Sequence, residues 1–326
     1  MILLVLALSQ QWTEISGDVL QKLKDESKKI DWPGATAGVA VDPATGDVYM
    51  VVPGQGLWKS GDQGKTFARA DGGAVGGRAE TSYALQFDPA GKRLACFMLD
   101  GKCAMTADGG ATWTPFTGLG RNWDYAAVDW SAQEVKTIFG ARHENGGDVY
   151  LSPDAGKTWN KLWAEPEFEK SGGLGIFDAT TLVYTMKGKG IQRSTDAGKT
   201  WAQVSELEPW GRVIRVRQGV GYWLSKEGMR VSRDKGATWT LQGTAVDATI
   251  GPMFDPKDEK RFAVAGNKGI FTTSDGGATW TSVVAKLPEK FSMPKPGWFA
   301  NVDWDPARNL FYASQMGKGT YRLETK

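Results

Sequence analysis

The octapeptide SPDAGKTW occupies residues 152–159, and a nearly identical one, STDAGKTW, returns at residues 194–201. Both fit the pattern [Ser/Thr]-x-Asp-x-Gly-x-Thr-[Trp/Phe]. Four more copies are SGDQGKTF at 60–67, TADGGATW at 106–113, SRDKGATW at 232–239 and TSDGGATW at 273–280. Their acidic residues are Asp62, Asp108, Asp154, Asp196, Asp234 and Asp275, spaced 38 to 46 residues apart. A five-letter constraint that recurs six times at one period indicates an internal repeat.

The segments around each octapeptide alternate between apolar and polar residues, as β-strands do. GDVYLS precedes the copy at 152 and TWNKL follows it. Two further strand-like segments lie upstream of each copy, for example SYALQF and RLACFM joined by the turn DPAGK. Four strands in roughly 40 to 45 residues are typical of one blade of a β-propeller.

The octapeptide is therefore expected on the hairpin between the third and fourth strands of a blade. There the Asp carboxylate can accept backbone N–H bonds from its own turn, and the Gly permits a positive φ. The final aromatic residue is expected to pack between sheets, which explains five of the 15 Trp residues. A structural role for the six aspartates follows, rather than catalysis.

The two ends of the chain carry the remaining strands. KGTYRL at 318–323 fits the third strand of a seventh blade, and QQWTEIS at 10–16 fits a fourth strand without its octapeptide. We expect the N-terminal strand to pair with the C-terminal blade, with Trp12 close to Tyr321. The prediction is an all-β fold: residues 10–326 form a single seven-bladed β-propeller of four-stranded antiparallel blades.

The six octapeptides resemble the Asp-box, or BNR, repeats of a broad propeller family. That family includes sialidases, xyloglucan-active glycoside hydrolases, sortilin-type receptors and Ycf48-like photosystem II assembly factors. The resemblance covers the chain from about residue 10 and implies the fold, but fold does not imply function. It also implies that the boxes lie at the periphery, away from the ligand face.

Two enzymatic members of the family can be compared with this sequence. Sialidases of this type have six blades and an Arg-Ile-Pro or similar motif, whereas this sequence has seven expected blades and no such motif. Xyloglucan-active relatives place their cleft between two seven-bladed domains, and this chain supplies one. The single-ring assembly factors match it best in size and blade number.

Ligands of propellers usually bind the face that carries the loops from strand two to three and from strand four to the next blade. Four Trp residues outside the octapeptides fall in these loops: Trp32, Trp123, Trp210 and Trp298. They could form aromatic platforms for a sugar ring or a peptide, or they could fill the space between blades.

The same loops carry cations, namely Arg78, Arg121, Arg142, Arg212, Lys226 and Lys318. Several blades contribute them, so they could converge into a positive funnel, or they could be scattered and solvated. Since Arg suits carboxylate recognition, the combination with Trp predicts a protein partner or an acidic glycan as ligand.

Catalytic candidates are weaker and also lie in loops: His143, Glu144, Asp124 and Asp247. His143 is the only histidine, and acid–base hydrolysis of a glycan needs two carboxylates roughly 5 to 9.5 Å apart. Two hypotheses remain open. The first is a non-catalytic binding scaffold, and the second is a glycoside hydrolase or polysaccharide lyase at the same face.

The remaining expectations come from composition and from single segments. A formal net charge of +2 gives no case for nucleic-acid binding, and no apolar run of 18 residues is present. Residues 1–9 fit either a signal peptide, which would make the protein periplasmic or secreted, or a buried strand. Residues 18–30 are expected to form a helix with a capping box at Asp18 and Gln21, as a lid or a clasp.

We expect no cofactor, no metal site and a monomer. Cys96 and Cys103 lack the company that a zinc site needs, and a disulfide between them is not favoured by their expected diagonal placement.

Overall fold

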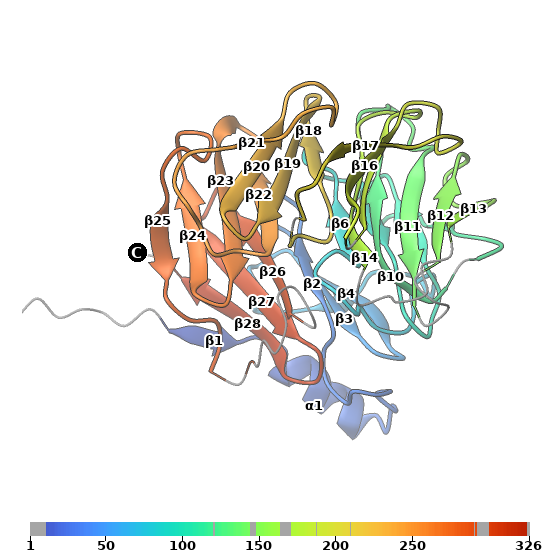
Figure 1. Cartoon of the computed structure of the whole chain (residues 1–326). Coiled ribbons are helices and arrows are strands. Elements are labelled where there is room, and N and C mark those ends of the chain that lie inside the picture. The colour runs from blue at the N-terminus through green and yellow to red at the C-terminus, as the bar shows by residue number, and fades with distance from the viewer. Residues whose placement is uncertain are drawn as a thin grey trace, which may run out of the picture.

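The computed structural model describes residues 11–119, 121–143, 148–163, 171–186, 188–208, 210–289, 291 and 300–324. These residues form seven four-stranded antiparallel sheets arranged in a ring, with one short helix (Figure 1). The predicted seven-bladed β-propeller is confirmed.

Each blade runs from an inner strand near the ring axis to an outer strand. Blades 1 to 3 comprise β2 (Val39–Val41), β3 (Val48–Val52), β4 (Gly56–Ser60) and β5 (Ala68–Arg69); β6 (Leu85–Phe87), β7 (Leu94–Cys96), β8 (Ala104–Thr106) and β9 (Thr114–Pro115); and β10 (Trp123–Val128), β11 (Ile138–Arg142), β12 (Val149–Ser152) and β13 (Asn160–Trp163). Blades 4 and 5 comprise β14 (Ser171–Ile176), β15 (Leu182–Met186), β16 (Gly190–Ser194) and β17 (Ala202–Ser205); and β18 (Arg215–Arg217), β19 (Val220–Ser225), β20 (Gly228–Ser232) and β21 (Thr240–Leu241).

Blades 6 and 7 complete the ring. They comprise β22 (Ile250–Asp255), β23 (Asp258–Gly266), β24 (Gly269–Thr273) and β25 (Thr281–Val284); and β26 (Ala300–Asp305), β27 (Leu310–Gln315), β28 (Gly319–Glu324) and β1 (Trp12–Glu14).

The ring is closed by β1, which pairs antiparallel with β28. Trp12 lies opposite Leu323 and Glu14 lies opposite Tyr321. The pairing continues past the strand, since Ile15 N–H donates to the Thr320 carbonyl at 2.8 Å. Sealing the first and last blades in this way covers a strand edge that would otherwise be exposed. The predicted closure is confirmed.

Antiparallel strands place alternate connections at opposite ends of a blade, so the ring has two faces. We call the face with the second-to-third-strand turns and the inter-blade loops the loop face. The octapeptide face carries the first-to-second-strand turns and the six octapeptides.

The octapeptides form the same hydrogen-bonded turn in all six blades that contain them. In the copy at 152, Asp154 Oδ1 accepts from Thr158 N–H at 2.8 Å and Oδ2 accepts from the Thr158 hydroxyl at 2.7 Å. Ser152 Oγ in turn accepts Gly156 N–H at 2.8 Å. Equivalent bonds from the octapeptide Thr hold the pKa of Asp108 at about 2. The expected structural role of these carboxylates agrees with this geometry.

A second turn, of which DPAGK at 88–92 is one copy, is also repeated from blade to blade and lies beside the octapeptides. Its Asp accepts the backbone N–H two residues later through Oδ1, as in Asp88 with Ala90 at 2.9 Å. The same bond is made by Asp42, Asp129, Asp178, Asp255 and Asp305. Blade 5 has the two-residue turn Gln218–Gly219 at this place, with φ of 51° and 77°.

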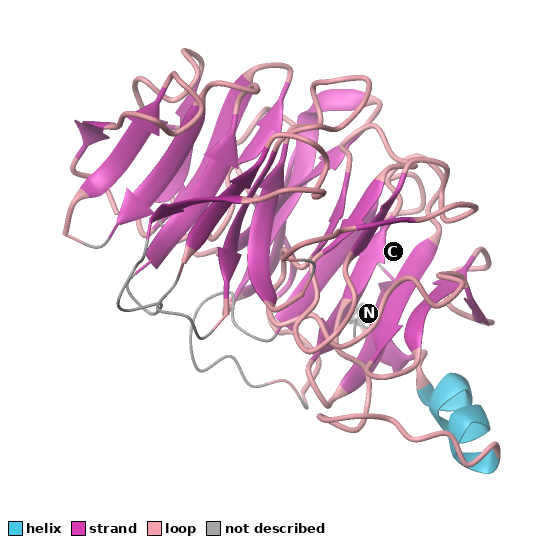
Figure 2. Cartoon of the chain, turned by 90° about the vertical axis from the view of Figure 1, so that its right-hand side faces the viewer, coloured by secondary structure: helices cyan, strands magenta, loops and turns pink. Residues whose placement is uncertain are grey.

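The helix α1 is shorter than predicted and begins earlier. It spans Gly17–Asp25 rather than residues 18–30, and its N-cap is Ser16, so the capping box expected at Asp18 is wrong. Gln21 instead donates to Asp25 Oδ1. Figure 2 shows the helix outside the body of strands, where Val19 and Leu23 pack on blade 1.

The core lies between neighbouring blades, where inner and middle strands pack face to face. Trp123 is fully buried there, with its ring 4.3 Å from that of Trp159. Cys96 and Cys103 are also buried and are not joined by a disulfide. Within the described part of the chain, no helix is long and apolar enough to cross a bilayer.

Candidate functional site

The loop face carries a groove of about 740 Å³ between blades 5 and 6. Its walls come from the loop before β18, the β19–β20 turn, the loop before β22 and the β23–β24 turn. Trp210, Lys226, Asp247 and Lys268 are among the lining residues, together with Trp280 from the sixth octapeptide. Three of these, Trp210, Lys226 and Asp247, were candidates from separate stretches of sequence, and the structure brings them together.

Trp210 forms an exposed aromatic surface at one end of the groove. Its backbone N–H and that of Gly211 both donate to the Leu224 carbonyl, which ties the loop to β19. The indole remains 40% exposed, and Lys226 Nζ lies 4.5 Å from its ring centre. A cation at this distance is attracted to the ring face by about 0.5–1 kcal/mol, which holds the platform in place.

The rest of the lining is polar and accessible. Asp247 and Lys268 face each other at 3.4 Å, but both side chains are more than half exposed, so the pair contributes little to stability. Thr244, Asn267 and Ser282 add hydroxyl and amide groups. These are hydrogen-bonding groups beside an aromatic platform, an arrangement that suits a polyhydroxylated ligand.

The Trp280 indole sets the sixth octapeptide apart from the others. The Trp of the copy at 194 donates its Nε1–H to the carbonyl of Gly198, and three further copies do the same. The Trp280 Nε1–H has no acceptor among the described residues. A polar donor thus lies unpaired behind the groove wall.

A second exposed aromatic residue lies between blades 1 and 2. Trp32 is 65% exposed, and the Arg78 guanidinium lies 4.6 Å from its ring centre. Arg78 also pairs with Asp100, and its Nε donates to Glu80 at 3.3 Å. Burial raises the pKa of Glu80, while Arg78 opposes the shift. Arg78 is thus held by carboxylates rather than free to bind one.

His143 and Asp124 form a hydrogen-bonded pair beside this cluster. The distance from His143 Nδ1 to Asp124 Oδ1 is 2.7 Å, and the Asp124 side chain is fully buried whereas that of His143 is 20% exposed. Asp124 can therefore orient the imidazole but cannot contact a ligand itself. Glu144, the other catalytic candidate here, lies outside the described residues.

The remaining candidates do not converge into one funnel. Arg212 is buried, with 8% of its surface exposed, and its guanidinium lies 5.5 Å from the Tyr125 ring centre. Arg142 donates to the Arg121 carbonyl at 3.4 Å, and Lys318 is exposed in the β27–β28 turn of blade 7. Trp123 is the first residue of β10 and is fully buried, so it packs in the core and cannot serve as an exposed platform. Trp298 lies outside the described residues.

Side chains of opposite blades meet across the ring axis. Tyr83 of blade 2 reaches blade 6: its hydroxyl accepts Gly251 N–H at 3.0 Å and lies 3.1 Å from the Gly251 carbonyl. Burial raises the pKa of Tyr83 to about 12. Arg215 of blade 5 donates to the Phe87 carbonyl of blade 2 at 3.3 Å.

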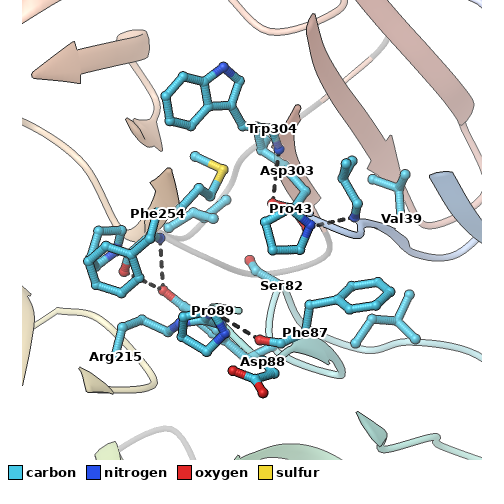
Figure 3. Close-up of a pocket in the computed structure, with 18 residues that line it drawn as sticks. Val39, Pro43, Ser82, Phe87, Asp88, Pro89, Arg215, Phe254, Asp303 and Trp304 are labelled. Carbon is cyan, nitrogen blue, oxygen red and sulfur yellow. Dashed lines mark hydrogen bonds between the residues drawn. The ribbon is translucent and has the colours of Figure 1, made fainter. Parts of the chain in front are cut away.

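Around these crossings only a small cavity of about 40 Å³ remains. Figure 3 shows Arg215 and Asp303 on opposite sides of it, with Pro43, Pro89 and Phe254 nearby. Asp303 accepts Val41 N–H at 2.8 Å, and burial raises the pKa of Asp303 to about 6. Exposed Trp side chains therefore lie above blade junctions, not around an axial mouth.

The axial residues could not be singled out from the sequence, because Arg215 and Asp303 lie on inner strands and Tyr83 stands two residues before one, in segments whose pattern indicates packing. One signal was present in the segment RVIRVR at 212–217: three arginines on an inner strand and its approach, where neighbouring blades carry apolar residues. The described residues hold no cluster of three or more His, Cys, Asp or Glu side chains that could bind a metal.

No protein-family model matches the sequence. A xyloglucanase of Hypocrea jecorina (strain QM6a) is 28% identical over 177 residues, which cover 51% of this chain and 20% of that protein. A xyloglucanase of a Paenibacillus species is 24% identical over 205 residues, which cover 56% of this chain and 20% of that protein. The chain thus spans about a fifth of the length of these curated relatives.

Solved propellers resemble the structure over most of its length. An ancestral GH74 enzyme superposes with a TM-score of 0.54 and 13% identity, covering 90% of this chain and 45% of that one. YCF48 bound to a D1 peptide superposes with a TM-score of 0.49 and 17% identity, covering 90% and 92%. The likeness to the GH74 enzyme concerns the fold.

Proposed function

We propose that this chain is an exported, monomeric Asp-box β-propeller that binds a glycan in the groove between blades 5 and 6. The observation that carries the proposal is the convergence of Trp210, Lys226 and Asp247 on one accessible groove. A sugar ring would stack on the free part of the indole, and its hydroxyls would bond to the polar lining.

The sequence relatives favour a glycan over a protein as the ligand. Both are named as xyloglucanases, and together with the groove chemistry this makes a polysaccharide the first class to test. Lys226 and Lys268 lie in the groove as well, so an acidic glycan is to be tested beside a neutral one.

Hydrolysis is the second candidate function, which the same relatives suggest. Glycoside hydrolysis commonly uses two carboxylates on either side of the scissile bond. Within the described lining of the groove, Asp247 is the one carboxylate, and Lys268 lies 3.4 Å from it. Binding is therefore the function that these side chains support better.

The test measures binding of xyloglucan oligosaccharides and of oligogalacturonides by isothermal titration calorimetry. Trp210→Ala should weaken binding about tenfold or more, because the stacking surface is lost. Trp32→Ala is the matched control, since it removes an exposed Trp–cation pair elsewhere on the loop face. Equal affinities of the wild type and Trp210→Ala, or no binding of either glycan, would refute the site.

Release of reducing sugar from both glycans distinguishes the two functions. Turnover that Asp247→Asn abolishes would replace the binding proposal with a hydrolase. Glycan binding without turnover would support the scaffold.

A further inference from the structure

A separate pocket of about 400 Å³ lies on the octapeptide face, at the opposite end of the ring axis from the loop face. It is lined by the first-to-second-strand turns of blades 2 to 6. Its size is within the range of roughly 300–1,000 Å³ that is usual for small-molecule sites. Tyr83 and Arg215, which cross the axis, separate it from the loop face.

Blade 5 lacks the Asp turn that the other blades lining this pocket carry. Blades 2, 3, 4 and 6 carry the Asp turns of Asp88, Asp129, Asp178 and Asp255, whereas blade 5 turns through Gln218 and Gly219. Gln218 and Gly219 line the pocket at this point. Val128, Ile176 and Val216, from the ends of three neighbouring inner strands, form an apolar floor.

One wall carries a carboxylate without a cation. Asp129 of blade 3 is only 6% exposed, and its Oδ1 accepts the backbone N–H and the hydroxyl of Ser131. No Lys or Arg among the described residues forms an ion pair with it. The neighbouring Asp88 differs, because Arg93 Nε donates to its Oδ2 at 2.6 Å. A buried carboxylate without a counter-charge is costly, and it favours a cationic group in the space beside it.

The wall on blade 5 carries a cation without a carboxylate. Arg217 donates to the carbonyl of Asp255 at 2.8 Å and packs against Phe254, 5.4 Å from its ring centre. Among the described residues no acid lies within ion-pair distance of it. Asp129 and Arg217 also do not pair with each other, so they lie more than 4.0 Å apart. Blade 4, with Ile176 and Phe177, stands between them.

We propose that this pocket binds an α-amino acid with a large apolar side chain. The ammonium group would pair with Asp129, the carboxylate would pair with Arg217, and the side chain would lie on the apolar floor beside Trp130. Arg93 stacks on the Trp130 ring at 5.4 Å and donates to its carbonyl at 2.7 Å, which fixes this wall before a ligand arrives. Each charge of a zwitterion thus meets its opposite, whereas a simple anion or cation meets one partner and one repulsive group.

The experiment uses L-phenylalanine with two analogues of the same apolar body: 3-phenylpropionate, which lacks the ammonium group, and 2-phenylethylamine, which lacks the carboxylate. Isothermal titration calorimetry and saturation-transfer NMR should show binding of L-phenylalanine near one molecule per chain. Each analogue should bind roughly tenfold to a hundredfold more weakly, because one charge-assisted contact is lost.

Two substitutions test the assignment of each charge. Asp129→Asn keeps the Oδ1 acceptor of the turn, so it should weaken L-phenylalanine to the level of 3-phenylpropionate and leave 3-phenylpropionate itself unchanged or tighter. Arg217→Gln should weaken L-phenylalanine to the level of 2-phenylethylamine and leave 2-phenylethylamine itself unchanged or tighter. Asp42→Asn is the matched control, since Asp42 makes the same turn bond on blade 1 outside the pocket.

Circular dichroism and thermal melting confirm that each variant is folded before its affinity is interpreted. Equal binding of L-phenylalanine and 3-phenylpropionate would overturn the proposal, as would an unchanged affinity in Asp129→Asn or no binding of the amino acid at millimolar concentration. Trp210→Ala should leave this affinity unchanged, so failure of the glycan site and failure of this site are separable.

Discussion

Replacement of Tyr83 by Phe removes a single oxygen from the hub of the ring. In the wild type that oxygen accepts Gly251 N–H at 3.0 Å and lies 3.1 and 3.4 Å from the carbonyls of Gly251 and Thr249. These bonds join blade 2 directly to blade 6 across the axis. Tyr83 is 3% exposed, so water cannot easily replace them.

The expected loss follows from what Tyr83→Phe leaves behind. Phe fills the same volume, so no cavity term arises, but Gly251 N–H is left without its acceptor. Burial of one unsatisfied backbone donor costs about 1–3 kcal/mol. A protein of this size should therefore melt several degrees lower, at about 2–4 °C per kcal/mol.

Urea denaturation followed by tryptophan fluorescence measures this loss. The midpoint should fall while the m-value stays constant, because the native fold is retained. Tyr150→Phe is the control: its hydroxyl donates to Asp148 at 3.2 Å on a half-buried side chain, and its loss should cost less than about 1 kcal/mol. If Tyr83→Phe is no less stable than Tyr150→Phe, the axial bonds do not stabilise the ring.

Three further outcomes are expected. Hydrogen bonds from the octapeptide Thr lower the folded pKa of the octapeptide aspartates, to about 2 in Asp108, whereas the unfolded value is about 4. The stabilisation by these bonds is present above pH 4 and should disappear as the pH falls toward 2. The melting temperature should therefore drop between pH 4 and 2, and a flat profile would contradict this. Asp303 affects the pH dependence of stability in the opposite direction. With a folded pKa of about 6, the native state holds an extra proton between pH 4 and 6, so the free energy of unfolding should decrease as the pH rises through that window. In Asp303→Asn, denaturant titrations should show a smaller change of the free energy of unfolding with pH there. Deletion of residues 1–14 exposes the edge of β28, and size-exclusion chromatography should then show oligomers together with a lower melting temperature; an unchanged monomer peak and melting curve would mean that β1 does not seal the ring.

The blades could be predicted from sequence because the repeat is local. Each octapeptide forms its turn from its own Ser or Thr, Asp, Gly and Thr, and no distant residue is needed to specify it. The closing strand was predictable for a related reason, since QQWTEIS repeats the pattern of a fourth strand. The helix end was not, because the chain leaves the helix after Asp25 and Ser27 takes a φ of 53°, a turn that the apolar pattern of residues 18–30 does not reveal.

The site was predictable only in part, because loops are positioned by their neighbours. Trp123 and Trp210 look alike in sequence, each shortly before an inner strand. In the structure β10 begins at Trp123 and buries it against Trp159, whereas Trp210 stands five residues before β18 and stays in the surface loop. Local patterns do not encode that difference, which is set by the length of each loop.

Departures from the repeat gather around blade 5, and both proposed sites border it. Its inner strand reads RVR and is only half buried, whereas the corresponding strands VAV and LQF of blades 1 and 2 are apolar or neutral and fully buried. Its first turn lacks the Asp, and Gln218 and Gly219 of that turn line the pocket on the octapeptide face. The loop before it carries Trp210, and the octapeptide facing it from blade 6 carries Trp280, whose indole N–H has no acceptor in the described chain. In a repeat protein, a blade whose strand, turn and loop differ from the pattern of the other blades is where a ligand site is expected, because functional sites are where local sequence rules are usually broken. The agreement of strand, turn and loop on one blade is therefore a stronger argument for binding there than any one of these residues alone.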